Sequence, residues 1–366
     1  MFRRILVPLD GSARAEQALP IAARIARASG GSVMLLHVLT ATREFGPYLG
    51  QSALQHEVID AAIADVTTYL SKAAQAHSLA GVETKVALLS GPEALTILDT
   101  AKEQQSNLIL IASHGATGFK RWALGSVAQK VARESPVPVL VLRDRGTVPS
   151  SAYPDKTRPL HTVAAVVALD GSQLAEAAIL PAANLVAALA APASGSLHLT
   201  RVVQRPSVDA ILSGRARMDP QQRDQTSSEA IEYLCKRADD LRASLGVDLN
   251  LAITWSIALD TTVANALIKV AEQGRVDGGT CIFGGCDILA LATHGRSGLQ
   301  RWALGSVTEH TLGRTKLPLL IVRPQQEQLK LASATSGRLN ERPRWDERIK
   351  GNNRCIRKRR NRRDDS

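Results

Sequence analysis

Two short motifs in this sequence carry residues that could bind a ligand, and each motif occurs twice. The first is Asp-Gly-Ser, at residues 10–12 and again at 170–172. The second is Gly-Ser, at residues 125–126 and 305–306, inside two copies of the heptapeptide RWALGSV. A Gly-Ser pair that opens a helix presents backbone N–H groups at the positive end of the helix dipole, where phosphate oxygens bind favourably. The Gly-Ser motif therefore indicates a phosphate-binding loop in each copy.

Both motifs also have a structural interpretation that needs no ligand. The serine of the Gly-Ser pair and the Gln or Glu three residues later fit a capping box, which requires only a well-capped helix. The aspartate of the Asp-Gly-Ser motif could also simply help to cap the helix that follows it. The residues alone leave both interpretations open at these positions: Ser126 with Gln129, Ser306 with Glu309, Asp10 and Asp170.

The other reactive side chains do not form a recognisable catalytic or metal centre. His114 and His294 precede the Gly-Ser pairs, but neither has a second histidine or a pair of carboxylates nearby in the sequence. Cys281 and Cys286 have no partner pair and give only a weak zinc signal. They lie in the segment 277–286, which interrupts the repeat and is expected to be a surface excursion. The P-loop and G-x-G-x-x-G motifs are both absent, so a kinase or dehydrogenase function is not indicated.

The elements that must position these motifs alternate between short apolar strands and amphipathic helices. This pattern predicts a parallel sheet covered on both faces. Right-handed connections then give a doubly wound sheet, which binds ligands at the carboxyl ends of its strands. In the first copy the expected strands are 5–7, 32–39, 82–89, 108–112 and 137–142, and the expected helices are 13–28, 53–76, 94–104 and 126–134. The second copy repeats this scheme from 163–167 to 319–322.

The spacing of the repeated motifs predicts two duplicated domains. The Asp-Gly-Ser motifs are 160 residues apart and the Gly-Ser motifs are 180 apart, so the second copy holds twenty extra residues. The stretch 144–161 contains three prolines without a periodic apolar pattern, and apolar periodicity stops again at residue 325. The predicted organisation is a first domain at 1–146, a linker at 147–160, a second domain at 161–324 and a disordered basic tail at 325–366.

With these motifs in place, the sequence resembles the universal stress protein family. That family carries G-x2-G-x9-G-[ST] after its fourth strand, and then a strand that reads like PVPVLVVR. Here residues 112–126 read Ala-x2-Gly-x9-Gly-Ser and lead to VPVLVLR, and residues 292–306 have the same pattern and lead to LPLLIVR. Both copies have alanine in place of the first glycine, where a positive φ would now cost energy and weaken binding.

The resemblance implies two α/β, Rossmann-like domains of the adenine nucleotide alpha hydrolase-like class, each a five-stranded parallel sheet with helices on both faces. It also implies that each domain binds an adenine nucleotide, often ATP with Mg²⁺ or Mn²⁺, in a stress response. Matching residues follow the first strand, end the second strand, and form the glycine-rich loop that holds ribose and phosphates. They are Pro8, Asp10, Gly11, Ser12, Val38, Gly115, Gly125, Ser126 and Val127 in the first copy, and Asp170, Gly171, Ser172, Val202, Gly295, Gly305, Ser306 and Val307 in the second.

The expected function is that of a regulatory binding module. Any ATP hydrolysis is expected to be slow, because the sequence shows no dedicated base or arginine finger. Two alternatives stay open: a dimeric interaction protein of this fold that has lost nucleotide binding, and a slow ATP hydrolase of the same structural class. The apolar fifth strands, 137–142 and 319–322, are expected to pair within one chain, as such strands often do in the family's dimers, and a homodimer also stays open.

The composition favours a soluble cytoplasmic protein and limits the role of its positive charge. Of the 366 residues 45% are hydrophobic, and four cysteines are too few for a disulfide scaffold. No apolar run is expected to reach the length of a membrane span, roughly 18–20 residues. The net charge is +11, but residues 325–366 carry thirteen Lys or Arg and six Asp or Glu, which leaves only +4 for the two domains. Nucleic acid is therefore expected to bind through this tail if at all, and a solvated extension is the favoured interpretation.

Overall fold

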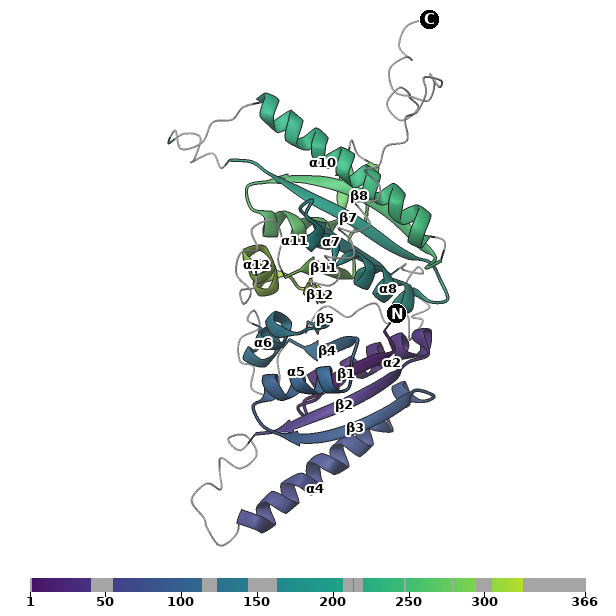
Figure 1. The fold of residues 1–366 in the computed structure, drawn as a ribbon, viewed down its shortest axis with the longest axis vertical. Coiled ribbons are helices and arrows are strands. Elements are labelled where there is room, and N and C mark those ends of the chain that lie inside the picture. Colours follow the sequence, from purple (N-terminus) through teal and green to yellow (C-terminus); the bar gives the residue numbers. More distant parts are fainter. Residues whose placement is uncertain are drawn as a thin grey trace, which may run out of the picture. The chain divides into compact units, whose positions relative to one another are not determined.

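A computed structural model describes residues 2–40, 55–113, 124–143, 163–206, 213, 220–246, 248–277, 280–293 and 305–324. Within this part of the chain, ten strands form one sheet in the order β3-β2-β1-β4-β5-β12-β11-β6-β7-β8 (Figure 1). Each half of this order belongs to one copy of the sequence repeat, and every strand pair within a half is parallel. The predicted α/β fold with two five-stranded parallel halves is therefore confirmed.

The helices and strands alternate along both copies. The first copy contains β1 (Arg4–Pro8), α1 (Ala13–Glu16), α2 (Ala18–Ser29), β2 (Ser32–Leu39), α4 (Gln55–Ala74), a 3-10 turn (His77–Leu79), β3 (Glu83–Ser90), α5 (Glu93–Glu103), β4 (Leu108–Ala112), α6 (Ser126–Glu134) and β5 (Val139–Leu142). The second contains β6 (Ala164–Leu169), α7 (Gln173–Glu176), α8 (Ile179–Ala190), β7 (Gly195–Gln204), α10 (Pro220–Leu241), a π-helical turn (Arg242–Gly246), β8 (Leu251–Asp260), α11 (Val263–Gln273), β9 (Arg275–Asp277), β10 (Thr280–Phe283), β11 (Ile288–Ala292), α12 (Ser306–Arg314) and β12 (Leu319–Val322). The predicted boundary of the two domains stays a prediction, because residues 144–162 lie outside the described ranges.

The helix expected over 13–28 is wrong in one respect, because it is interrupted after Glu16 and resumes at Ala18. Pro20 explains the interruption. Proline has no N–H to donate to the carbonyl four residues earlier, and its ring crowds that carbonyl, which here belongs to Glu16. The second copy has the same interruption between α7 and α8, four residues before Pro181. The break separates a short helix after the Asp-Gly-Ser motif from the longer helix that packs on the sheet.

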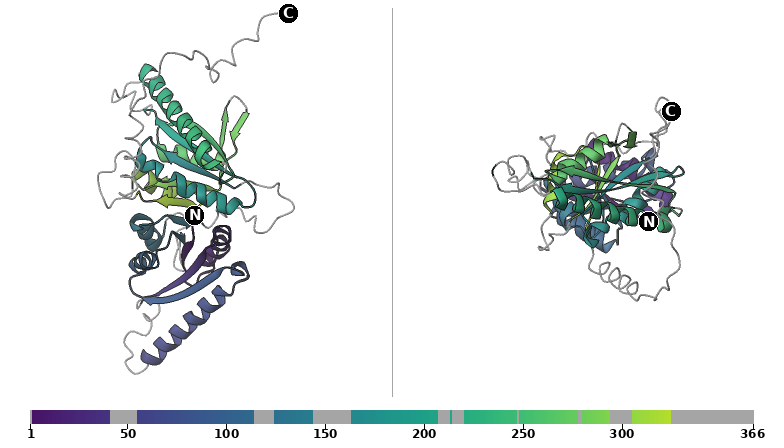
Figure 2. Two further views of the ribbon diagram at one scale, coloured as in Figure 1. Left: turned by 45° about the vertical axis from the view of Figure 1, so that its right-hand side comes forward. Right: turned by 90° about the horizontal axis from the view of Figure 1, so that it is seen from above.

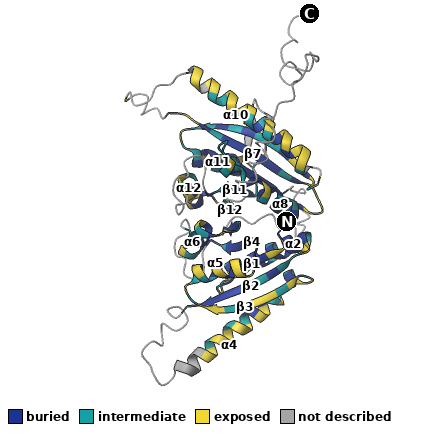
Figure 3. Cartoon of the chain, in the orientation of Figure 1, coloured by how far each residue is buried: buried dark blue, intermediate teal, exposed yellow. Residues whose placement is uncertain are grey.

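Two apolar cores cover the two faces of the sheet. Successive strand residues point to opposite faces, so Ile5 and Val7 join one core and Leu6 joins the other. Helices α1, α2, α4, α7, α8 and α10 cover the first face, and α5, α6, α11 and α12 cover the second. Burial is concentrated on the strands and on the sheet-facing sides of the helices (Figure 3). Both cores contain residues from both copies.

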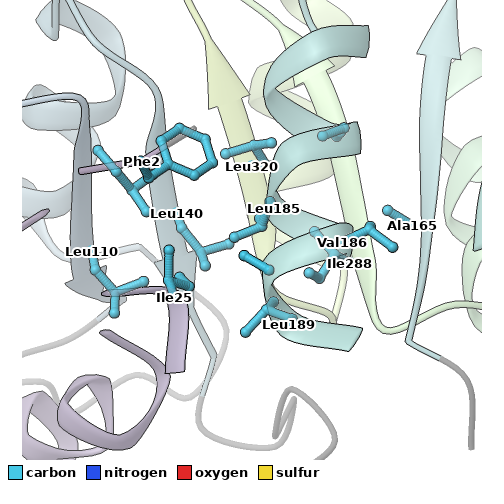
Figure 4. Packing of buried hydrophobic residues seen from close by; sticks show 14 of the residues in the cluster. Phe2, Ile25, Leu110, Leu140, Ala165, Leu185, Val186, Leu189, Ile288 and Leu320 are labelled. Carbon is cyan, nitrogen blue, oxygen red and sulfur yellow. The ribbon is translucent and has the colours of Figure 1, made fainter. Parts of the chain in front are cut away.

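The two halves of the sheet are joined by their fifth strands. Strands β5 and β12 pair antiparallel, with Leu140 opposite Leu320. On the first face α2 packs against α8, and Leu140 and Leu185 lie among the buried side chains there (Figure 4). Two arginines also cross the junction: Arg143 donates to the carbonyl of Leu312, and Arg323 Nη1 donates to the carbonyl of Glu134 at 3.1 Å. Each carbonyl lies near the carboxyl end of a helix of the opposite copy.

One segment corrects an expectation about membrane spans. The 18-residue window Gln173–Ala190 has a mean hydropathy of 1.5, so by length and composition it could cross a membrane. The window is not an unbroken apolar run, because it contains Gln173, Glu176 and Asn184, but it comes closer to a span than expected. In the structure 56% of the window is buried inside the fold as α7 and α8. A core helix that packs against a sheet and a second helix requires this composition as well.

The segment that interrupts the second repeat forms a β-hairpin. Strands β9 and β10 pair antiparallel as a two-stranded sheet that is separate from the ten-stranded one (Figure 2). Cys286 follows the hairpin, its Sγ lies 3.1 Å from the carbonyl oxygen of Ile288, and burial raises the pKa of its thiol to about 12. The hairpin leads into the amino end of β11, opposite the edge at which the Gly-Ser motifs lie.

Candidate functional site

The Asp-Gly-Ser motif forms a tight turn after the first strand of each half. The Asp10 carboxylate oxygen Oδ1 accepts hydrogen bonds from the backbone N–H of Ser12 at 3.0 Å and from its hydroxyl at 2.6 Å. The second copy has the same bonds from Ser172 to Asp170, at 2.9 and 2.6 Å. The intervening glycines have φ of 80° and 86°, in the left-handed region that favours glycine. The turn therefore requires all three residue types.

The serine of this motif, and not the aspartate, caps the following helix. The hydroxyl of Ser12 accepts from the backbone N–H of Ala15 at 3.2 Å, and Ser172 does the same for Ala175. Asp10 and Asp170 therefore help to cap these helices indirectly, because each aspartate orients the capping serine at the carboxyl end of β1 or β6.

The Gly-Ser motif begins a helix without a side-chain cap. Gly125 is extended, with φ −61° and ψ 148°, and is the N-cap of α6; Ser126 is the first helical residue. The backbone N–H of Gly125 donates to the Ser113 carbonyl at 2.8 Å, and its own carbonyl accepts from Gln129. Gly305, Thr293 and Glu309 repeat these bonds at α12. No side chain in the described ranges caps either helix.

The capping-box interpretation of Ser126 and Ser306 is consequently wrong. A capping box needs the serine at the N-cap, where its hydroxyl can reach the N–H of the third helical residue. Here the glycine takes that position, because its N–H is bonded to the end of the preceding strand. The first backbone N–H groups of an α-helix have no partner within the helix. The N–H groups of the first turn thus point beyond the carboxyl edge of the sheet.

The two motifs lie at the same edge of each half-sheet. Strand β1 pairs with β2 on one side and with β4 on the other, and β6 lies in the same way between β7 and β11. The chain leaves β1 and β4 on opposite faces, which makes this position a topological switch point where open α/β sheets bind ligands. The Asp-Gly-Ser turn and the start of the Gly-Ser helix flank it.

The other residues expected at the nucleotide site lie on neighbouring strands and at the helix starts. Pro8 ends β1, and Val38 is 7% exposed near the end of β2, opposite Leu89 of β3. In the second copy Val202 is half-buried opposite Ala258. Val127 and Val307 are half-buried in the first turns of α6 and α12. The expected residues Gly115 and Gly295 lie outside the described ranges, as do His114 and His294.

The alanines at the first loop position do not carry the strain that their type suggested. Ala112 and Ala292 are the last residues of β4 and β11. The non-glycine residues with positive φ in the described ranges are Gln105 and Asn250, so neither alanine has the left-handed conformation that would penalise it.

A cluster behind each Asp-Gly-Ser turn was not predicted. In the second copy Tyr233 donates to Glu176 Oε1 at 2.7 Å, and Arg237 pairs with Glu176 Oε2 at 2.6 Å. Burial and the bond to Glu176 raise the pKa of the Tyr233 hydroxyl, and the Arg201 guanidinium lies 5.6 Å from the centre of its ring. Glu176 is the last residue of α7, so this cluster holds the helix that Ser172 caps.

The first copy has a related cluster around Tyr69. Burial, Glu16 and Asp10 raise the pKa of the Tyr69 hydroxyl. The ring of His37 lies 6.5 Å from the Tyr69 ring, edge to face. A comparison of the two repeats could have found both clusters, because Glu16 recurs at 176 and Tyr69 recurs at 233.

The residues around the site do not form a metal-binding cage. In the described ranges no three His, Cys, Asp or Glu side chains come together as they would around a metal ion. The donors at the helix starts are N–H groups and a hydroxyl, which suit an anion.

Comparisons with known proteins agree with this geometry. The family model of the universal stress protein family matches residues 1–143 and 284–323. The universal stress protein YxiE of Bacillus subtilis is 30% identical over 148 residues, which are 39% of this chain and 100% of that protein. A universal stress protein of Thermus aquaticus is 32% identical over 148 residues, with the same coverage of both chains. The crystal structure of a universal stress protein from Archaeoglobus fulgidus has the same fold, with a TM-score of 0.57 and 19% identity over 88% of this chain and 97% of that one. The chain belongs to the universal stress protein family.

Proposed function

We propose that the chain binds an adenine nucleotide, ATP in the first instance, at the switch point of each half of the sheet. The observation that carries the proposal is the start of α6 and α12. Both are nine-residue helices that begin at the carboxyl edge without a side-chain cap. A phosphate group would satisfy the N–H groups of the first turn and would interact favourably with the helix dipole.

The rest of the proposed site suits a nucleoside. Pro8, Val38 and Val127 offer apolar contacts for a purine base, and the Asp10 carboxylate would accept hydrogen bonds from a ribose or a base. The second site has Ala168 where the first has Pro8, and otherwise the same residue types. Membership of the universal stress protein family supports this assignment.

A divalent cation such as Mg²⁺ fits this site only as a companion of the nucleotide. Mg²⁺ keeps several waters and commonly binds substrate phosphates with one or two carboxylates, so it needs no cage of protein ligands. When bound, it would neutralise part of the charge of the triphosphate. The N–H groups of Ser126 and Val127 would position the phosphates, and Asp10 would orient the nucleoside.

The proposed role is a cytoplasmic regulatory module that responds to stress, with ATP turnover slow or absent. We also propose that the pairing of β5 with β12 persists in solution, so that the two repeats act as one unit. Product analysis separates this role from that of an enzyme: AMP and pyrophosphate would indicate a nucleotide hydrolase of the wider class, whereas slow ADP formation or no turnover agrees with a binding module.

The test of the binding site replaces Ser126 and Ser306 with Asp. Both serines are exposed first residues of their helices, and a carboxylate there stabilises a helix by about 0.3–1 kcal/mol. The same carboxylate would repel a triphosphate. The S126D/S306D variant is therefore expected to unfold no more easily than the unaltered chain and to lose ATP binding in calorimetric titration.

The matched control is S126N/S306N, which has nearly the same shape and no charge and is expected to keep binding. Glycine variants are less suitable, because a Cβ on Gly305 would lie 2.9 Å from the Thr293 carbonyl oxygen and would distort the fold. If the unaltered chain shows no saturable binding at millimolar ATP, the proposed function is wrong. If S126D/S306D binds ATP normally, the position of the site is wrong.

A further inference from the structure

The two proposed sites share one framework, so any difference between them stands out. At both, the N-cap glycine donates to the carbonyl of the first residue after a strand, at 2.8 Å in each case. That residue is Ser113 in the first repeat and Thr293 in the second, and both are buried. The start of each helix is thereby fixed to the strand that leads into the glycine-rich loop.

The third residue of the helix differs between the repeats. It is Ala128 in α6 and Thr308 in α12, and each is 3% exposed. The Thr308 hydroxyl donates to the carbonyl of Ala292 at 3.0 Å. Ala292 is the last residue of β11 and the first position of the family's glycine-rich motif. The second repeat therefore fixes the end of β11 to the phosphate helix with two hydrogen bonds, and alanine in the first repeat cannot supply the second bond.

The other loop of the site shows a difference in the same direction. In the second repeat Tyr233 and Arg237 both bond to Glu176, and this fixes α7 behind the Asp-Gly-Ser turn. In the first repeat Tyr69 likewise lies beside Glu16, which corresponds to Glu176, but no arginine takes the place of Arg237. The position that corresponds to Arg237 is Ala73, which has no charged group.

We propose that Thr308 is a positioning residue that makes the nucleotide site of the second repeat the tighter of the two. This inference rests on the proposed function. A ligand that binds a helix start already held in place loses less conformational entropy than one that must fix the helix start itself. One hydrogen bond of this kind corresponds to roughly a two- to tenfold difference in affinity. The bonds behind the Asp-Gly-Ser turn act in the same direction.

The experiment measures each site by itself. S126D closes the first site and leaves the second, and S306D does the reverse, so calorimetric titration of the two variants with ATP gives one dissociation constant for each repeat. The S126D chain is expected to bind several-fold more tightly. Equal constants, or tighter binding by the S306D chain, would overturn the inference and leave the proposed function intact. Failure of the unaltered chain to bind ATP would instead refute the proposed function.

Three further variants test Thr308 itself. In the S126D chain, T308V keeps the shape of the side chain and is expected to weaken binding about two- to tenfold, whereas T308S keeps the hydroxyl and is expected to restore it. In the S306D chain, A128S supplies a hydroxyl at the corresponding position and is expected to tighten binding. A thermal unfolding curve of each variant separates loss of fold from loss of positioning. If T308V and T308S bind equally well, Thr308 has no positioning role.

Discussion

The arginines that cross between the two repeats give the most direct test of how the halves are held together. Arg143 is 8% exposed and donates to the carbonyl of Leu312. Arg323 is half-buried and donates to the carbonyl of Glu134. Both carbonyls are among the last four of a helix, which have no partner within the helix. We expect replacement of either arginine by Met to destabilise the whole chain.

The expected loss in free energy of unfolding follows from the contacts that each arginine makes. A hydrogen bond from a charged donor contributes about 1.5–3 kcal/mol, and a cation at a helix carboxyl end adds about 0.3–1 kcal/mol. Arg143 is the more buried of the two, so R143M should cost about 2–3 kcal/mol. R323M is more exposed to solvent and should cost about 1 kcal/mol. Met fills much of the space of the arginine stem, so the loss reports the polar contact more than the packing.

The assay is equilibrium unfolding in urea, with the midpoint compared at constant slope. Arg133→Met is the matched control, because Arg133 is an exposed residue of α6. It should change the free energy of unfolding by less than about 0.5 kcal/mol. R143K keeps the charge without the planar guanidinium, so its loss in free energy of unfolding should lie between those of R143M and Arg133→Met. If R143M and R323M both behave like the control, the arginines do not hold the repeats together.

Three other outcomes follow from the structure. Because the pKa of Tyr233 is raised in the fold, its hydroxyl contributes its full stabilisation below pH about 10, and this contribution is lost as the pH rises further. Y233F should lower the free energy of unfolding by about 1 kcal/mol at neutral pH, and its stability should fall less between pH 7 and 11 than that of the unaltered chain, as thermal unfolding would show. The Cys286 thiol, with its pKa raised to about 12, should resist iodoacetamide at pH 8 in the folded chain and react in urea, as peptide mass spectrometry would show; fast labelling in the folded chain would contradict this. Gly11→Ala should cost about 1–2 kcal/mol in urea unfolding because of its φ of 80°, although a Cβ there would meet nothing within 4 Å; an unchanged midpoint would contradict the positive φ.

The sequence predicts most elements well where one strong signal decides them. The strands at 32–39 and 108–112 and the helix at 126–134 have the expected bounds, because apolar runs and a Gly-Ser start leave few alternatives. The helix at 13–28 is interrupted because Pro20 acts on Glu16, four residues away, against a continuous apolar pattern.

The candidate site is only partly predictable, since its geometry depends on contacts distant in sequence. The capping-box pattern at Ser126 is satisfied in the sequence, but the bond from Gly125 to Ser113 moves the N-cap back by one residue. The role of Thr308 depends on the carbonyl of Ala292, sixteen residues earlier, and no local pattern reveals it. The apolar window at 173–190 likewise reflects packing against α2 of the other repeat, which hydropathy alone cannot distinguish from a lipid environment.

The pairing of β5 with β12 has a consequence during synthesis on the ribosome. Strand β5 ends at Leu142, and its partner begins at Leu319, so 177 residues must be made before that edge is covered. At about 5–20 residues per second, the first half waits with an open edge for roughly 10–35 s. In a polysome, two neighbouring nascent chains carry such edges at the same time. An exchange of second halves would preserve every strand pair, so a domain-swapped dimer is expected to form more readily as the concentration of chains during translation rises.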